Sequence, residues 1–495
     1  MANGAPGVLE HLRRLLLALT NSGIHYPESS IIHDYMHILL IAYDNDSYMH
    51  HFPQGLAYIA AVLVREGYAV EIYNQDKFHY CEEHLTSYLD RNKFDVVGVG
   101  VIAGYYQYRK LLKISQAIKK SKNKPFYILG GHGPSPDPKF FIEKTGADAV
   151  VIGEGEETIV DLIRALANNQ PLAKVNGIAF CDGKEIVNIP RRPIIMDVDS
   201  IPFPAYDLFP MDYYRLFRAP RALSSDFVMP VLSGRGCKFK CNFCYRMDKG
   251  IRIRKNESII EEILFLQKNY GITYIIFSDE LLMSSSDRTI ALAEDIIRNK
   301  LNIRWYCNGR LNYAKPEVLT IMKRAGCLFI NYGIEAMDDE VLKNAQKGLT
   351  VDCIIKGIEN TLNAGISPGY NIIFGNIGDS KKTLDRAVRF LLKYDDCKQM
   401  RTIRPVTPYP GSPLYYYAIK KGLLRDCEDF YEHKHINSDL LSVNFTKLSD
   451  EEFHKELEMA NEILIRNYYQ KKTEETLEKA RRLYQEKDKT FRGFR

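Results

Sequence analysis

The sequence predicts an α/β protein made of a Rossmann-like, doubly wound domain, a partial (βα)6 barrel and a helical C-terminal region. Short apolar runs alternate with amphipathic segments, which is the pattern of β/α units. This alternation occurs twice along the chain. At 495 residues the chain is also too long for a single ordinary core, and about three structural units are expected.

The first series of apolar runs predicts a sheet of five parallel strands. Amphipathic segments such as residues 55–67 separate the runs, which lie at residues 36–42, 69–73, 95–101, 125–130 and 147–153. In a doubly wound sheet the ligand lies beyond the carboxyl ends of the strands. We expect this domain to span residues 36–170, after an N-terminal extension of residues 1–35.

Residues 171–226 interrupt the alternation. Asp182-Gly183 is typical of a tight hairpin turn, and residues 201–210 contain several prolines. We interpret this segment as a linker that contains a hairpin.

The second series predicts a partial barrel over residues 227–410. Its expected strands are residues 227–232, 272–278, 303–307, 328–334, 369–375 and 399–406. Helix signals lie between them: a Ser258-x-x-Glu261 capping box, Pro316 near a helix start, and Gly326 just past a helix end. Successive right-handed β/α units curl into a barrel whose active face is the carboxyl end of its strands. Residues 411–495 are predominantly helical and charged in pattern.

Composition excludes several classes of protein. The 67 basic and 62 acidic residues give a net charge of +5, which provides no strong argument for nucleic acid or a membrane surface. No apolar run approaches the roughly 20 residues that span a bilayer, and residues 15–19 are too short for a secretory signal. Seven of the ten cysteines are scattered singly, unlike a disulfide framework. We therefore expect a cytoplasmic protein.

The remaining cysteines, Cys237, Cys241 and Cys244, form a C-x-x-x-C-x-x-C motif after the first strand of the barrel. A barrel enzyme places its chemistry at this end of the strands. A structural zinc site would need four ligands, and no other Cys or His occurs between Pro220 and Asn256. Three thiolates instead suit an iron–sulfur cluster that leaves one iron open to an external ligand.

This loop resembles that of the radical S-adenosylmethionine (SAM) superfamily. From about residue 36 to residue 425, the chain is similar to the subgroup with an N-terminal cobalamin (B12)-binding domain. The resemblance implies that the three cysteines hold a [4Fe–4S] cluster and that the fourth iron binds the amino and carboxylate groups of SAM. It also implies reductive cleavage of SAM to a 5′-deoxyadenosyl radical, with an electron donor such as flavodoxin or ferredoxin.

The resemblance assigns a set of SAM-binding candidates. Phe243 precedes the last cysteine, Asp279 and Glu280 end the motif SDE, and Glu335 ends GIE. Arg310, in NGR, is a candidate for the SAM carboxylate. In the segment 375–380 the subgroup usually has a proline and a glutamate where this chain has Ile377 and Asp379; Asp379 remains a candidate for the nucleoside. Ordinary loop salt bridges are the alternative role for the charged residues.

Three further segments, residues 51–63, 130–134 and 153–158, resemble the B12-binding pattern. The motif Asp-x-His-x-x-Gly, which supplies a cobalt ligand in other B12 proteins, is absent, so a domain that keeps the fold without binding cobalamin stays open. The glycines at 98, 100 and 104 do not match a dinucleotide fingerprint. The cobalamin-binding candidates are Tyr43, Tyr105, Gly130, Gly131, His132, Gly153 and Glu154.

Three functions are compatible with these observations. The leading one is a cobalamin-dependent radical SAM methyltransferase, which acts on an unactivated carbon or phosphorus centre of a small-molecule or peptide substrate through methylcobalamin. The second is a radical SAM oxidative cyclase or rearrangement enzyme without net methylation. The third, from another class, is a non-catalytic metal-containing RNA-binding protein, although the chain lacks a basic face interleaved with aromatic residues.

Overall fold

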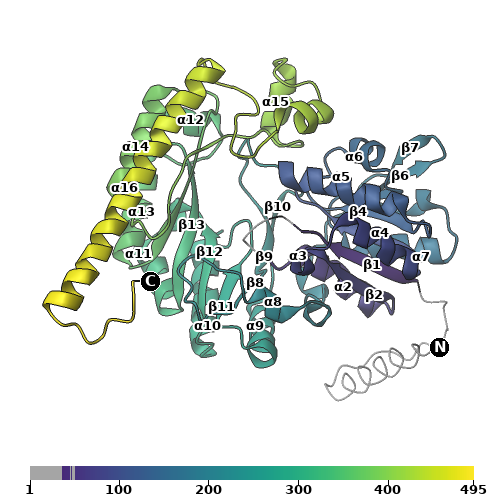
Figure 1. Ribbon diagram of the computed structural model, residues 1–495, viewed down its shortest axis with the longest axis horizontal. Helices are drawn as coiled ribbons and strands as arrows, with labels where there is room; N and C mark the ends of the chain where they lie inside the picture. The colour runs from purple at the N-terminus through teal and green to yellow at the C-terminus, as the bar shows by residue number, and fades with distance from the viewer. Residues whose placement is uncertain (1–35, 45, 47–50, 495) are drawn as a thin grey trace. The chain divides into compact units, whose positions relative to one another are not determined.

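Both expected sheets are present in the computed structural model, which describes residues 36–44, 46 and 51–494 (Figure 1). The predicted extension, residues 1–35, lies outside the described residues. The first sheet has the order β2-β1-β3-β4-β5-β6-β7. Its strands are β1 (His37–Ala42), β2 (Ala69–Asn74), β3 (Val96–Gly100), β4 (Phe126–Gly130), β5 (Ala149–Val151), β6 (Ile178–Asp182) and β7 (Glu185–Asn188).

The first five strands are parallel. Successive side chains point to opposite faces of the sheet, and helices cover both faces. Ile38 and Leu40 of β1 pack with α2 and α7, whereas Leu39 and Ile41 pack with α4, α5 and α6. The helices are α2 (Gln54–Arg65), α3 (Gln75–Phe78), α4 (Glu82–Arg91), α5 (Tyr105–Lys120), α6 (Pro138–Thr145) and α7 (Glu156–Ala167). This doubly wound order reverses between β1 and β3, where such folds bind ligands.

The hairpin expected within residues 171–226 is formed by β6 and β7, and its two-residue loop is Gly183-Lys184. Gly183 has a φ of +63°, a conformation that favours glycine. Because β6 pairs antiparallel with β5, the hairpin extends the first sheet. Only the residues after it run from one sheet to the other, with a short helix α8 (Met211–Tyr214).

The second sheet contains six parallel strands in the order β15-β14-β13-β12-β11-β8, and each matches an expected β/α unit. It is a partial barrel, because β8 and β15 are at opposite edges and do not pair. The strands are β8 (Val228–Val231), β11 (Tyr274–Phe277), β12 (Arg304–Gly309), β13 (Cys327–Glu335), β14 (Ser367–Phe374) and β15 (Arg404–Pro405). A hairpin that the sequence did not predict, β9 (Gly234–Cys237) with β10 (Gly250–Ile253), follows β8.

The helices of the barrel pack on one face of this sheet. They are α9 (Asn256–Tyr270), α10 (Ser286–Arg298), α11 (Pro316–Arg324), α12 (Asp339–Asn344), α13 (Val351–Asn363) and α14 (Lys381–Tyr394). The capping box predicted at Ser258 is wrong, because α9 begins at Asn256 and the Ser258 hydroxyl accepts a hydrogen bond from Arg254. Pro316 and Gly326 lie where expected, at the first position of α11 and just beyond its end.

The C-terminal region is helical, as expected, and contacts β14 of the second sheet and helix α6 beside the first sheet. Its helices are α15 (Pro413–Lys420), a π-helical turn (Asp429–Lys434) and α16 (Asp450–Gln485), which runs along α14 in Figure 1. Phe453 of α16 stacks on Phe374 of β14, with 4.8 Å between ring centroids, while Tyr431 stacks on Phe140 of α6. In the described part of the chain, no helix is both long and apolar enough to cross a membrane.

Candidate active site

The three motif cysteines lie together in a loop that distant elements fix in place. Cys237 ends β9, and Cys241 and Cys244 follow it. Between them, the Asn242 backbone N–H donates to the carbonyl of Ala345 at 2.9 Å, and the Asn242 carbonyl accepts from the Leu414 N–H at 2.8 Å. The loop is thus held between the end of α12 and the start of α15.

The thiols themselves are suited to a cluster. Cys241 is buried, and Cys237 and Cys244 are half-buried. A hydrogen bond from the Cys244 thiol lowers the pKa of Cys241 to about 6. No three Cys, His, Asp or Glu side chains in residues 36–44, 46 and 51–494 are arranged to hold a single metal ion. An iron–sulfur cluster takes each thiolate on a different iron, so this donor set fits a cluster better than one ion.

Arg310 places a positive charge beside the thiols. Its guanidinium lies 3.6 Å from the ring centroid of Phe239, a residue of the cysteine loop, and it donates to the backbone carbonyl of Lys347. It also lies close enough to Cys241 to interact electrostatically. Its Nε is buried and has no hydrogen-bond partner among the described residues. An unpaired buried donor is costly, so this position fits an anionic group such as the carboxylate of SAM.

Glu335 ends β13 and turns back over its own strand. Its backbone φ is +71°, and its Oε1 accepts a hydrogen bond from Lys347 Nζ at 2.8 Å. A Cβ at Gly333 would lie 2.4 Å from this Oε1 and 2.8 Å from Nζ. Only glycine leaves room for the ion pair, which explains the first residue of the motif GIE.

Asp279 and Glu280 are adjacent in sequence but occupy different environments. Asp279 is buried, and its two oxygens accept from the Ser233 N–H and hydroxyl, each at 2.6 Å, and from Arg288 at 3.1 Å. Glu280 is exposed and accepts from the Gly236 N–H at 2.8 Å. Both acids therefore hold the segment that leads into the cysteines, and Glu280 also remains accessible to a ligand.

Asp379 closes the turn that follows β14. Its Oδ2 accepts from the backbone N–H groups of Gly375 and Asn376 at 3.0 and 2.9 Å, and its Oδ1 accepts from the Thr383 hydroxyl at 2.7 Å. Burial raises the pKa of Asp379 to about 6. Every one of these contacts lies within its own turn. The remaining SAM candidate, Phe243, is half-buried.

The cobalamin candidates follow the carboxyl ends of four strands of the first sheet. Tyr43 follows β1, and burial raises its pKa to about 12. Tyr105 begins α5, with its ring centroid 6.5 Å from that of His435. Gly130 ends β4, and the next residues, Gly131 and His132, lead toward the barrel. The His132 ring meets the ring of Tyr245, next to Cys244, at 6.2 Å.

The backbone favours glycine at two of these positions. Gly131 has a φ of +97°, and a Cβ there would lie 2.5 Å from the carbonyl oxygen of Val101, so close packing against backbone requires glycine. Gly153 has a φ of +87°, which favours glycine, whereas its neighbour is the guanidinium of Arg191, the end of a flexible side chain.

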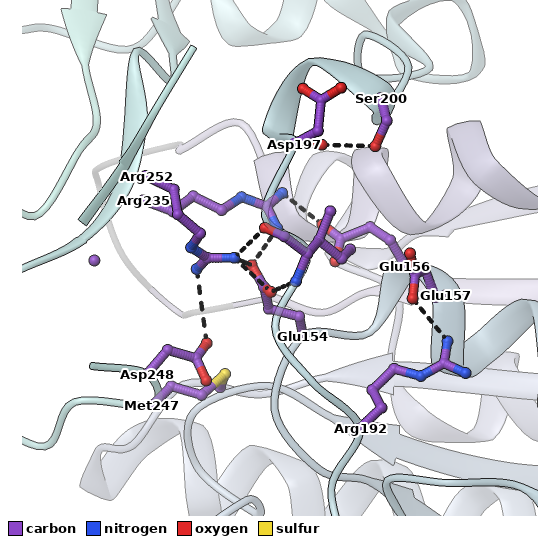
Figure 2. Close-up of polar contacts among 12 residues, drawn as sticks. Glu154, Glu156, Glu157, Arg192, Asp197, Ser200, Arg235, Met247, Asp248 and Arg252 are labelled. Atoms are coloured by element: carbon purple, nitrogen blue, oxygen red, sulfur yellow. Dashed lines mark hydrogen bonds and ion pairs between the residues drawn. The ribbon is translucent and has the colours of Figure 1, made fainter. Parts of the chain in front are cut away.

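Glu154, after Gly153, lies in a charged network rather than at a free edge (Figure 2). It accepts hydrogen bonds from Arg235 of β9 at 3.0 Å and from Arg252 of β10 at 2.8 and 2.7 Å. Burial would raise the pKa of Glu154, but hydrogen bonds from Arg252, Ile195 and Arg235 lower it below its usual range. This residue joins the first domain to the strands around Cys237.

A cavity of about 280 Å³ lies between the barrel strands β8, β11 and β12 and the residues just before α2. Its rim includes Asn308, whose amide donates to the backbone carbonyl of Asp279 at 2.7 Å. No Lys, Arg, Asp or Glu is among the described residues that line it, which include Phe52, Gln54, Tyr214, Ser278, Tyr306 and Asn308.

Sequence reasoning missed several residues of this region. Lys347 pairs with Glu335, Arg288 with Asp279, and Arg252 with Glu154. Arg288 and Lys347 lie 9 and 12 positions from their partners, and Arg252 lies 98 positions from Glu154. No local motif marks such residues, so only the fold brings them to the site.

Two family models match the chain: the B12 binding domain over residues 42–163 and the Radical SAM superfamily over residues 231–391. An uncharacterized methyltransferase of Pyrococcus horikoshii is 30% identical over 377 residues, which cover 75% of this chain and 79% of that protein. The chain belongs to the radical SAM superfamily, in the subgroup with an N-terminal B12-binding domain. This radical SAM protein is therefore an enzyme, and its cofactors are a [4Fe–4S] cluster, SAM and cobalamin, as predicted. The non-catalytic alternative is set aside.

Other relatives of this radical SAM enzyme differ in their named reactions. Cytidylyl-2-hydroxyethylphosphonate methyltransferase of Streptomyces wedmorensis is 24% identical and covers 77% of this chain and 80% of its own length. Anaerobic magnesium-protoporphyrin IX monomethyl ester cyclase of Rubrivivax gelatinosus is 26% identical, with 76% and 68% covered.

Among solved structures, the radical SAM methyltransferase TsrM from Kitasatospora setae matches with a TM-score of 0.65 at 19% identity, covering 78% of each chain. OxsB, a cobalamin-dependent SAM radical enzyme, matches with a TM-score of 0.62 at 18% identity, covering 82% of this chain and 59% of OxsB. At these identities the matches show the fold: two α/β units and a helical C-terminal region in the predicted order.

Proposed function

We propose that this radical SAM enzyme is a cobalamin-dependent methyltransferase that acts on an unactivated carbon or phosphorus centre. The supporting observation is that the carboxyl edge of the first sheet meets the cysteine loop. His132 lies against Tyr245, and Glu154 binds Arg235, two residues before Cys237. Transfer of a group between two cofactors requires them to lie in one shared space, and the contact between this edge and the cysteine loop supports such an arrangement.

In this proposal each group of residues binds a different cofactor. Cys237, Cys241 and Cys244 hold the cluster, Arg310 binds the SAM carboxylate, and the Glu335–Lys347 pair contacts the polar part of SAM. When bound, the cluster and SAM supply the 5′-deoxyadenosyl radical, and cobalamin carries the methyl group. Tyr43, Tyr105 and the 130–132 turn surround the cobalamin edge.

The substrate and the partners are further parts of the proposal. We place the substrate in the 280 Å³ cavity, whose lining of aromatic rings, neutral amides and His51 favours a hydrogen-bonding group with apolar surface. We propose flavodoxin or ferredoxin as the electron donor, because reductive SAM cleavage consumes one electron. None of the ten cysteines forms a disulfide, which supports a reducing, cytoplasmic location.

The oxidative cyclase is the second candidate, because a relative with 26% identity carries that name. It differs from the first in the fate of the SAM methyl group. A methyltransferase moves this group to the product, whereas a cyclase or rearrangement enzyme forms 5′-deoxyadenosine without methylating its substrate.

The deciding experiment uses anaerobically reconstituted full-length protein with iron, sulfide, hydroxocobalamin, a reductant and SAM carrying a CD3 methyl group. We expect about one cobalamin per chain after gel filtration, formation of 5′-deoxyadenosine, and a product of cell extract that is heavier by one CD3 group. 5′-Deoxyadenosine formation with an extract substrate but without CD3 transfer favours the cyclase. Failure to retain cobalamin contradicts the methyltransferase.

A further inference from the structure

A buried ionic network joins the B12-binding domain to the hairpin that leads to the cluster. Arg235 on β9 and Arg252 on β10 are direct cross-strand neighbours. Two like charges placed opposite each other destabilise a strand pair. Figure 2 shows both guanidinium groups directed at Glu154, which comes from the loop between β5 and α7. Glu154 is the acid that both arginines share, while Glu156 pairs with Arg235 and Asp248 lies 3.9 Å from Arg252.

The surrounding contacts keep this network away from water. The side chains of Arg252, Glu154 and Arg235 are only 6%, 9% and 16% exposed. Glu156 accepts a second hydrogen bond from Arg235 at 2.5 Å, and Arg252 also donates to the Ile195 carbonyl at 2.7 Å. Loss of one partner from a buried ion pair costs far more than loss of a surface pair.

The carboxylate of Glu154 is fully used by the protein. Its Oε1 accepts from Arg235 and Arg252, and its Oε2 accepts from Arg252 and from the Ile195 N–H at 2.9 Å. A carboxylate offers about four acceptor positions, and all are taken. In the structure the Glu154 carboxylate binds the hairpin and the Ile195 N–H, and the role in cobalamin binding that the sequence suggested stays a prediction.

We propose that Glu154 is a positioning residue, which fixes the β9–β10 hairpin, and with it Cys237, relative to the edge of the B12-binding domain. Cys237 is the last residue of β9 and pairs directly with Gly250 of β10. A hairpin free to shift would move the first cluster ligand relative to cobalamin. The reason for a fixed distance between Cys237 and cobalamin rests on the proposed function, methyl transfer. The contact between Glu154 and the hairpin does not depend on that function.

The test compares Glu154→Gln, Arg252→Gln and the double variant in the full-length protein, with Glu157→Gln as the control. Glu157 lies three residues away and pairs with Arg192, but its side chain is 56% exposed. The first measurement is hydrogen exchange of the β9–β10 amides before cofactors are added. We expect exchange about 100-fold faster in Glu154→Gln, recovery toward wild type in the double variant because both charges leave together, and no change in the control.

The second measurement is the electron paramagnetic resonance spectrum of the reduced, SAM-bound cluster, which a loss of stability alone does not alter. We expect an altered spectrum in Glu154→Gln and a wild-type spectrum in the control. Should Glu154→Gln fail to fold, Arg252→Lys keeps the charge but loses the shared contact, and about 10-fold faster exchange is expected.

The proposal is overturned when the β9–β10 amides of Glu154→Gln exchange at the wild-type rate. The same result in Arg252→Lys overturns it where that variant is used instead. Loss of cobalamin from Glu154→Gln with unchanged hairpin exchange overturns it as well, because Glu154 is then a cofactor ligand. Absence of methyl transfer in the wild-type enzyme would refute the proposed function and leave the exchange result intact, so the two failures are distinguishable.

Discussion

The carboxyl edges of the two sheets hold their functional groups in different ways. In the barrel, the three thiols come from one loop, residues 237–244, which hydrogen bonds to Ala345 and Leu414 hold in place. At the first sheet, the cobalamin candidates come from four separate loops, which follow β1, β3, β4 and β5. The difference shows that a site built from one segment carries its ligands in a local motif, while the contacts of a site assembled from several loops become visible only in the fold.

The largest expected effect sharpens this contrast on the barrel side. Cys237→Ala, Cys241→Ala or Cys244→Ala should reduce iron from about four per chain to near zero and abolish reductive SAM cleavage, because each thiolate is a ligand of the cluster. Iron analysis and 5′-deoxyadenosine measurement after anaerobic reconstitution provide the test. Cys353→Ala is the matched control, since Cys353 is half-buried in α13. Stoichiometric zinc in the wild-type protein would contradict the cluster.

The sequence was sufficient to predict both sheets and the cysteine loop, because strands such as β1 are continuous apolar runs and the motif is local. It did not predict β9 and β10. Strand β9, GRGC, has two glycines and no alternation of apolar residues, and is stabilised by contacts such as that between Gly236 and Glu280. The role of Glu154 could not be predicted either, because its partners Arg235 and Arg252 lie 81 and 98 positions away.

A second, smaller effect concerns the side chains that surround the cluster. If the buried pair contacts SAM rather than iron, as we propose, Glu335→Gln and Lys347→Met should each weaken SAM binding about 10- to 100-fold while iron stays at the wild-type level. Equilibrium binding of SAM to the reconstituted protein measures this. Glu340→Gln, an exposed acid of α12, serves as the control. Wild-type affinity in both variants would return the pair to a structural role.

The third prediction moves to the first sheet's edge, where stability should depend on pH. His435 is fully buried beside Tyr409 and Phe430, its Nδ1 lies 3.2 Å from the Ser442 hydroxyl, and its Nε2 has no partner among the described residues. Burial lowers the pKa of His435 to about 4. The unfolded chain binds a proton near pH 6.5 and the folded protein only near pH 4, so stability is complete above about pH 6.5 and falls by about 3 kcal/mol as the pH drops to 4.

Urea unfolding between pH 7.5 and pH 5, in which His435→Phe is compared with wild type, measures this contribution. The variant keeps an aromatic ring for the stack with Phe430 but binds no proton, so its stability should fall less steeply with decreasing pH. The control is His454→Phe, because His454 is exposed on α16. Parallel curves for His435→Phe and wild type would show that His435 binds its proton at the same pH in the folded protein as in the unfolded chain.

The smallest expected effect concerns Asp379 at the edge of the barrel sheet and tests whether this acid binds SAM. Asp379 differs from Glu335 because its hydrogen bonds all lie within the turn 375–383. Asp379→Asn keeps one acceptor oxygen for the two backbone N–H groups but places an amide opposite the Thr383 hydroxyl. We expect the free energy of unfolding to fall by about 1 kcal/mol and SAM affinity to stay within about twofold of wild type. Thr383→Val, which removes the hydroxyl at the same contact, should lower stability by a similar amount.

The opposite result would be a loss of SAM affinity above about 10-fold in Asp379→Asn, with unchanged affinity in Thr383→Val. Asp379 would then contact the nucleoside of SAM although its hydrogen bonds in the structure all lie within its own turn. The carboxyl edges of the two sheets would in that case differ less than their contacts indicate.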